Sequence, residues 1–148
     1  MEESEKEEEK IKKERELDRL LSILKKIKGS GTELISLYIS DGYPLHEVTA
    51  KLTDEYSQAG NIKSKTTRKN VQAAIEKILN YLKTFKSTPK NGIAIFCGNI
   101  SQDPSKVDVE LYSIVPPYPI QVQLYRCDST FLLDPLEGLK EKRKNMGL

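Results

Sequence analysis

Two amphipathic segments separated by a short polar break constrain the fold of this chain more than any other feature. The second segment has the strongest helical pattern in the sequence, with apolar side chains at steps of three and four residues: Val71, Ala74, Ile75, Ile78, Leu79, Leu82 and Phe85. The first segment shows the same spacing in Leu45, Val48, Leu52 and Tyr56. Gly60 and Asn61 lie between them, and we expect the helix to break there because both residue types tolerate left-handed backbone angles. The pattern predicts a helical hairpin.

Four apolar or alternating runs before and after the hairpin predict strands. Residues 34–39 and 93–97 are almost continuously apolar, which is typical of strands covered on both faces. Residues 107–112 and 120–125 alternate apolar and polar side chains, which predicts strands with one wet face. Further helices are expected from residue 11 to Gly29 and over residues 132–139. This order predicts a small α/β sandwich, in which helices flank a four-stranded mixed sheet and the hairpin projects from it.

The length of 148 residues suits a single domain with a core of its own. Residues 1–10 are dense in Glu and Lys, and we expect a solvated, disordered tail there. The folded domain is expected over residues 11–139. The basic stretch 140–148 is expected to begin a linker towards a further domain.

Composition excludes several function classes. No apolar run approaches the roughly 20 residues of a membrane helix, and the charged N-terminus is unlike a signal peptide. Cys97, Cys127 and the single histidine, His46, form no ligand cluster, so we expect no metal and no cofactor. These features favour a reduced, cytoplasmic protein. Because the net charge is only +2, any nucleic-acid binding must come from a local patch.

The first candidate patch is the basic stretch at the hairpin tip. It contains Lys63, Lys65, Arg68 and Lys69. Such a cluster can bind phosphates, although a solvated helix start would have the same composition. Cations near a helix N-terminus oppose the helix dipole, which favours a role for the charge in binding a ligand. Thr66 or Thr67 is expected to cap the second helix.

The second candidate is the polar face of the last predicted strand. Alternation places Gln121, Gln123, Tyr125 and Cys127 on one side. An aromatic hydroxyl beside small polar groups can stack on a base and hydrogen-bond its edge, whereas an ordinary solvent-facing strand is the alternative. Glu55, near the end of the first hairpin helix, could accept a hydrogen bond from a base amino group. A Cys127–His46 nucleophile pair is a weaker alternative, since nothing in the sequence brings the two together.

Two motifs at this separation resemble a known family. Asn61-Ile62-Lys63-Ser64 is followed by Tyr125-x-Cys127-x-x-x-Phe131, and residues 91–98 match the family's central strand. Over residues 17–139 the chain resembles the stop-codon-reading N-terminal domain of the class I peptide chain release factors of archaea and eukaryotes. The Gly-Thr-Ser motif of that family is here Gly31-Thr32-Glu33, and its Thr-Ala-Ser is Gln58-Ala59-Gly60. Together with the Glu- and Lys-rich N-terminus, these departures favour an archaeal member.

The resemblance implies recognition of UAA, UAG and UGA in the ribosomal A site. Asn61 and Lys63, with Ile62 and Ser64, would read the first base. Glu55, Tyr125 and Cys127 would discriminate the purines, Thr32 and Gly31 would face the third base, and Phe131 would support the strand end. Lys65, Arg68 and Lys69 would contact phosphates of small-subunit ribosomal RNA.

The resemblance further implies that the chain is a monomeric recognition domain and not an enzyme. Family members hydrolyse peptidyl-tRNA through a Gly-Gly-Gln loop, which this sequence lacks, and recruit a translational GTPase through a third domain. Alternatives remain open. They are a ribosome-rescue factor that ignores codon identity, a general RNA-binding module, a small enzyme that uses Cys127 or His46, and a protein-interaction module whose charged first helix binds a partner.

Overall fold

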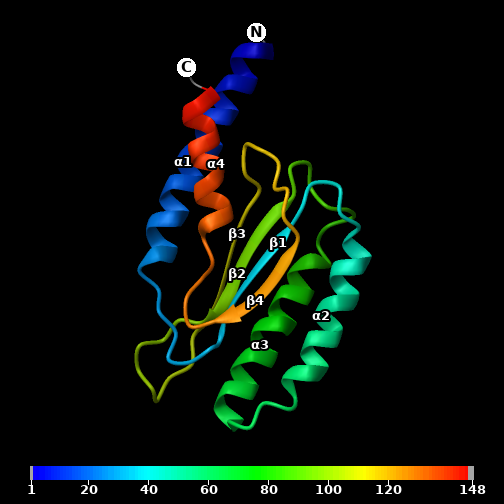
Figure 1. The fold of residues 1–148 in the computed structure, drawn as a ribbon, viewed down its shortest axis with the longest axis vertical. Coiled ribbons are helices and arrows are strands. Elements are labelled where there is room, and N and C mark those ends of the chain that lie inside the picture. Colours follow the sequence, from blue (N-terminus) through cyan, green and yellow to red (C-terminus); the bar gives the residue numbers. More distant parts are fainter. Residues whose placement is uncertain (1, 147–148) are drawn as a thin grey trace.

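The computed structural model describes the backbone of residues 2–146 and the side chains of residues 2–140. The sequence folds into four helices and four strands (Figure 1). In chain order these are α1 (Glu2–Lys25), β1 (Leu34–Ile39), α2 (Leu45–Ala59), α3 (Lys65–Leu82), β2 (Ile93–Asn99), β3 (Val109–Ile114), β4 (Leu124–Asp128) and α4 (Asp134–Met146). The predicted α/β sandwich and helical hairpin are confirmed.

The sheet is antiparallel throughout, in the order β3-β2-β1-β4, and the prediction of a mixed sheet is wrong. The reason lies in the hairpin. A single helix between two strands brings the chain back to the end of the sheet where the first strand began, so the second strand runs parallel to the first. Here two antiparallel helices, α2 and α3, stand between β1 and β2. The chain therefore returns at the end where β1 finished, and β2 runs the opposite way.

Each face of the sheet has its own apolar cluster. Ile35, Leu37 and Ile39 face α2 and α3, where Leu52, Ile75 and Ile78 are fully buried. Leu34 and Tyr38 face the other side and pack with Phe96 and with Leu17 and Leu21 of α1. Because both faces are covered, every residue of β1 and β2 is buried, as the continuous apolar runs predict. Figure 1 shows the hairpin lying along the sheet, with its tip beyond the strand ends.

The prediction of a disordered tail over residues 1–10 is wrong for residues 2–10, which form the first turns of α1. Glu and Lys are strong helix formers, and acids in the first turn suit the helix dipole. Contacts with the domain begin where these turns end. The Lys10 ammonium lies 4.9 Å from the centre of the Tyr118 ring, whose hydroxyl donates a 3.2 Å hydrogen bond to Glu14. Met1 lies outside the described residues.

Helix α4 also extends further than expected, through Met146, so most of the predicted linker at 140–148 is helical. Its first turns pack beside α1 through Lys25–Glu137 at 2.6 Å and Lys140–Asp18 at 3.2 Å. Residues 147–148 lie outside the described residues. None of the helices in the described part of the chain combines the length and apolar character needed to cross a bilayer.

The last strand is displaced from its predicted position, since β4 begins at Leu124 and not at Ile120. The Ile120 backbone instead joins two loops, donating to Asn91 O at 2.9 Å and accepting from Asp41 N at 2.9 Å. Gln123 then ends the pairing with β1, because its Oε1 accepts the Ser40 N–H at 2.8 Å. Val122 is 42% exposed, so the alternation at 120–124 does not mark a sheet face.

Candidate nucleic-acid interface

The hairpin tip is a continuation of the last helical turn and not a left-handed break. Gly60 has φ −59° and ψ −19°, and Asn91 is the one described non-glycine residue with positive φ. Asn61 N–H donates to Gln58 O at 3.0 Å and Ile62 N–H to Ala59 O at 3.1 Å. The expectation of left-handed angles at Gly60 and Asn61 is therefore wrong. Short-range bonds of this kind tighten a helix end and satisfy the donors that follow it.

Ser64 caps α3, not Thr66 or Thr67 as predicted. Its side-chain oxygen accepts the Thr67 N–H at 3.2 Å, and its extended backbone (φ −68°, ψ 118°) is typical of an N-cap. Arg68 fixes the tip from inside the helix, because its Nη1 donates to Ile62 O at 3.1 Å. Asn61, Lys63, Lys65 and Lys69 are exposed. The tip thus presents the exposed ammonium groups of Lys63, Lys65 and Lys69 on a backbone held at both ends.

Tyr125 and Cys127 lie on the face of β4 that turns towards α2 and α3. Both are half-buried against the core cluster on that side, to which Ile62 of the tip also packs. The sequence predicted a wet strand face here, and only its last two members belong to a strand. Cys127 Sγ donates to Thr32 O at 3.0 Å, which ties the loop before β1 to the end of β4. Tip, loop and strand therefore share one side of the sheet.

Burial and nearby carboxylates keep both side chains protonated. Desolvation raises the pKa of the Cys127 thiol to about 11, with further contributions from Glu33, Asp128 and Glu55. Desolvation likewise raises the pKa of Tyr125 well above its ordinary value, helped by Cys127 and Glu55. At neutral pH each side chain can donate a hydrogen bond, and neither carries charge. The high thiol pKa also opposes any role for Cys127 as a nucleophile.

Glu55 reaches this site from the last turns of α2. Its only ion pair among the described residues is with Lys51, at 3.5 Å on the same helix, and its side chain is 24% exposed. A pair of this kind is weak, and Glu55 can easily exchange Lys51 for another partner.

His46 lies in the first turn of α2, at the opposite end of the helix, so the structure separates it from Cys127. Within the described residues no cluster of His, Cys, Asp and Glu could hold a metal ion.

Glu33, which departs from the family motif, is a buried structural acid. It is 3% exposed, and Asn70 of α3 donates to its two carboxylate oxygens at 3.1 and 3.3 Å. This contact fixes the loop of Gly31 and Thr32 against α3 while Cys127 holds it from β4. Sequence reasoning missed Asn70. The sequence indicates Asn70 only through its position on the buried stripe of α3, where a polar side chain needs a hydrogen-bond partner.

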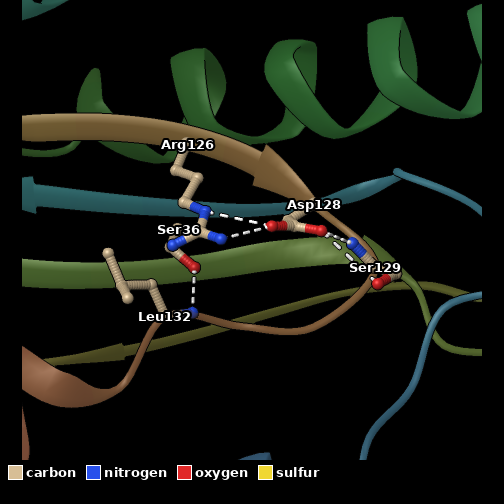
Figure 2. A network of polar contacts seen from close by, with 5 residues as sticks. All are labelled: Ser36, Arg126, Asp128, Ser129 and Leu132. Atoms are coloured by element: carbon tan, nitrogen blue, oxygen red, sulfur yellow. Dashed lines mark hydrogen bonds and ion pairs between the residues drawn. The ribbon is translucent and has the colours of Figure 1, made fainter.

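Phe131 is placed apart from the other predicted site residues. It is 6% exposed and packs edge to face on Phe96, with ring centres 5.6 Å apart, in the cluster that faces α1. Figure 2 shows how the chain around it is held: Arg126 and Asp128 pair on this side of β4, and Leu132 N–H donates to Ser36 Oγ at 2.8 Å. Phe131 thus anchors the strand end from the opposite face.

The tip, the loop of Thr32 and the end of β4 meet at one end of the molecule and supply three kinds of contact. Exposed ammonium groups attract phosphate, and the tyrosine ring offers a stacking surface. The Glu55 carboxylate and the Cys127 sulfur offer acceptors, and the Tyr125 hydroxyl offers a donor, whereas the Cys127 proton is engaged by Thr32 O. Unpaired bases need this combination of attraction, stacking and edge recognition. The geometry therefore fits recognition of single-stranded RNA.

Comparison with known proteins gives one consistent result. The family model described as eRF1 domain 1 matches residues 12–141. Peptide chain release factor subunit 1 of Pyrococcus abyssi is 53% identical over 133 residues, which are 90% of this chain and 32% of that protein. The protein of the same name from Methanocaldococcus jannaschii is 49% identical over 131 residues, or 88% of this chain and 31% of that one. The chain thus spans about a third of the length of these relatives.

A solved structure supports the same assignment. The crystal structure of the archaeal translation termination factor aRF1 superposes with a TM-score of 0.76 at 42% identity, covering 84% of this chain and 34% of that one. Another solved chain, described as an archaeal protein, gives a TM-score of 0.78 at 44% identity and covers 84% of this chain and 35% of that one. The family match covers nearly the whole described fold, and the chain therefore belongs to the eRF1 domain 1 family.

Proposed function

We propose that this chain reads stop codons in messenger RNA during translation termination. One observation carries the proposal: the basic tip, Thr32, Glu55 and the Tyr125–Cys127 strand end meet on one side of the fold, in a family whose relatives are named release factors. The tip alone would attract any RNA. The adjoining donors, acceptor and ring supply the selectivity that a codon reader needs.

The roles divide by chemistry. Asn61 and Lys63, exposed at the tip, are assigned to the uridine at the first position, with Ile62 and Ser64 shaping the backbone that presents them. Glu55 accepts from purine amino groups, the Tyr125 hydroxyl donates or accepts at purine edges, and the Cys127 sulfur, whose proton is engaged by Thr32 O, accepts there. Thr32, whose carbonyl is held by Cys127, presents its hydroxyl to the third base.

The flanking cations add affinity without selectivity. Lys65 and Lys69 are exposed on the first turns of α3 and are assigned to phosphates of small-subunit ribosomal RNA. Arg68 can share in this only through the guanidinium nitrogens that Ile62 does not engage. Within a full-length factor this domain would recognise and not catalyse. A Gly-Gly-Gln domain would hydrolyse peptidyl-tRNA and a further domain would recruit a translational GTPase, in the cytoplasm.

A release assay tests the proposal. In a chimaera, this chain replaces the corresponding domain of the Pyrococcus abyssi factor, and peptide release is measured on archaeal ribosomes programmed with UAA, UAG, UGA or the sense codon UGG. Lys63→Ala and Asn61→Ala should each lower release at stop codons by about 5- to 150-fold, the effect of losing one good base contact.

Lys86→Ala is the matched control, because it removes the same charge from an exposed position at the far end of the hairpin. It should leave release unchanged. Equal release by all variants, with normal thermal unfolding, would refute the proposal. Efficient release by the unmodified chimaera on UGG as well would show a codon-independent rescue factor instead.

A further inference from the structure

A cavity opens at the same end of the molecule as the tip, beside the first turns of α3. It has a volume of about 390 Å³ and three walls: Thr66 and Asn70 of α3, the loop at 28–30, and the loop from Asn99 to Val107 between β2 and β3. None of the residues assigned above to codon reading lines it. Its volume is at the lower end of the roughly 300 to 1,000 Å³ of small-ligand sites, so it suits one small molecular group and not an extended strand.

The walls of this cavity are tied together in the free protein. Asn99 Oδ1 accepts from Ser101 N at 3.2 Å and from Asp108 N at 2.9 Å, which closes the loop after β2. Gln102 Nε2 then donates to Lys28 O at 3.1 Å and so joins that loop to the one before β1. The site is therefore preformed, and a ligand would not have to order it.

Two buried asparagines line the cavity with unused hydrogen-bonding capacity. Asn99 is 7% exposed and Asn70 is 5% exposed. Asn99 uses its oxygen to hold its loop and Asn70 uses its nitrogen to hold Glu33. Within the described part of the chain, no hydrogen bond engages Asn99 Nδ2 or Asn70 Oδ1. Both side chains lie on the cavity wall, where Asn99 Nδ2 can donate a hydrogen bond and Asn70 Oδ1 can accept one.

The lysines on the cavity walls favour an anionic ligand, and the asparagine amides favour a ligand that also has a polar group. Lys28 and Lys106 lie on its walls, are exposed, and take part in no ion pair among residues 2–140. Asp103 also lines it, and its carboxylate accepts from Ser105 N at 2.9 Å and Ser105 Oγ at 2.7 Å, bonds that lower its pKa and keep it ionised. The two lysines outnumber this one acid, so the three groups together remain positive. Val107, 63% exposed, supplies an apolar surface beside the amides.

We propose that this cavity binds one unstacked RNA nucleotide, with the base edge on Asn70 and Asn99 and the phosphate on Lys28 and Lys106. Asparagine amides pair with base edges, and lysines hold phosphates as point charges. The inference rests on the proposed function in one respect: a domain that enters the ribosome meets such nucleotides in messenger and ribosomal RNA. The site adds an anchor that the codon-reading side chains do not provide.

Nucleotide titration of the isolated chain tests the chemistry directly. Amide spectra of the isotopically labelled chain are followed while AMP, GMP, CMP or UMP is added, with inorganic phosphate as a separate probe. We expect at least one nucleotide to shift the side-chain amide of Asn99 and the backbone amides of residues 28–30 and 100–107 in a saturable way. No saturable shift at these positions, or identical shifts with phosphate alone, would overturn the proposal.

Asn99→Asp is the sharpest variant, because it keeps the oxygen that closes the loop and removes the nitrogen donors. It should weaken nucleotide binding by about tenfold or more while the spectrum of the free chain stays intact. Asn80→Asp is the matched control, since it makes the same change at an exposed position of α3. Equal binding by both variants would contradict the assignment of Asn99.

A crosslinking experiment identifies the source of the nucleotide. A photoreactive phenylalanine analogue replaces Val107 in the chimaera, which is then bound to ribosomes paused at a stop codon. A crosslink to messenger or ribosomal RNA supports the proposal and tells the two sources apart. A crosslink to ribosomal protein alone would overturn it. The codon-reading proposal is decided separately, by the release activity of Lys63→Ala, so the two can fail independently.

Discussion

At the residue scale, the family motifs predict which side chains form the proposed site, whereas the contacts that support them were not visible in the sequence. Tyr125, Cys127 and Glu55 lie near one another, because the end of α2 covers the face of the sheet on which the side chains of Tyr125 and Cys127 lie. The contact between Asn70 and Glu33 could not be anticipated, because it joins residues 37 positions apart and depends on how α3 lies over β1. Spacing along a helix identifies the buried stripe but not the partner of a polar group within it.

That contact predicts a large stability effect. Asn70→Ala should lower the free energy of unfolding by about 2 to 4 kcal/mol, because it leaves the Glu33 carboxylate buried without its amide donor. Urea denaturation measures the change. Asn80→Ala, at an exposed position of the same helix, should stay within about 0.5 kcal/mol of the unmodified chain. If the two variants are equally stable, the Asn70 contact does not hold the loop of Thr32 in place.

The raised pKa of Cys127 predicts slow alkylation. Its thiol has a pKa of about 11 instead of the model-compound value of 9.0, so at pH 8 the folded chain should react with iodoacetamide on the order of 100-fold more slowly than the unfolded chain. Mass spectrometry of the peptide that contains Cys127 gives the rate. Fast labelling under native conditions would show that the thiol is exposed and ionised, contrary to its bond with Thr32.

The same shift sets the direction of a pH effect. The folded state holds the Cys127 proton more tightly than the unfolded state, so this contribution to stability is complete below pH 9 and is lost as pH rises towards 11. The raised pKa of Tyr125 acts in the same direction. Urea midpoints should therefore fall between pH 9 and 11. For Cys127→Ser, part of that fall should disappear, and an unchanged pH profile would exclude the thiol as a source.

At the element scale, periodicity correctly predicted the helices with a clear apolar stripe and the strands with a continuous apolar run. It failed where strand pairing or tertiary packing determines the local structure. Both hairpin helices, β1 and β2 are where the pattern puts them. The alternation of Ile120, Val122 and Leu124 suggested a strand, yet β1 pairs only with residues from Leu124 onwards. Charge density suggested disorder in residues 2–10, yet those residues continue a helix that packs on the domain.

Substitutions of Ser64, the N-cap of α3, distinguish its role in helix stability from its effect on RNA binding. Ser64→Ala should cost about 1 kcal/mol of unfolding free energy, because the Thr67 N–H loses its acceptor. Ser64→Asp keeps an acceptor and suits the helix dipole, so it should preserve stability while weakening RNA binding by placing a negative charge among the lysines. Chemical denaturation and an RNA titration measure the two effects. Loss of stability in both variants would mean that the serine hydroxyl, and not capping, is what α3 requires.

At the scale of the whole molecule, charge is distributed along the long axis. Six glutamates lie within residues 2–9, at the end of the molecule opposite the basic tip (Figure 1). Net charge alone therefore understates the local positive charge of the tip. Screening confines the field of that charge to about 8 to 10 Å at physiological salt, so we expect the acidic end not to disturb RNA binding at the tip. The net charge of +2 gives no sign that acidic and basic residues lie at opposite ends of the molecule, which is seen only in the fold.

This arrangement predicts how binding depends on salt. The isolated chain should bind a short single-stranded RNA weakly, with affinity falling steeply as salt rises. Removing residues 2–10 should leave affinity at about 150 mM salt unchanged and raise it only at low ionic strength, where screening is weak. Fluorescence anisotropy across a salt series measures both. A large gain in affinity at 150 mM salt would place the acidic helix close to the RNA site.

Crosslinking from the codon tests directly whether the tip contacts the first base of a stop codon. Ribosomes are programmed with 4-thiouridine at the first position of UAA, and the chimaera that carries this chain is bound and irradiated. We expect a crosslink within the peptide that contains Asn61, Ile62 and Lys63, and we expect it to be lost when the codon is changed to a sense codon with the same first base. Equal crosslinking at both codons, or crosslinking only outside the tip and the Tyr125–Cys127 strand end, would contradict it.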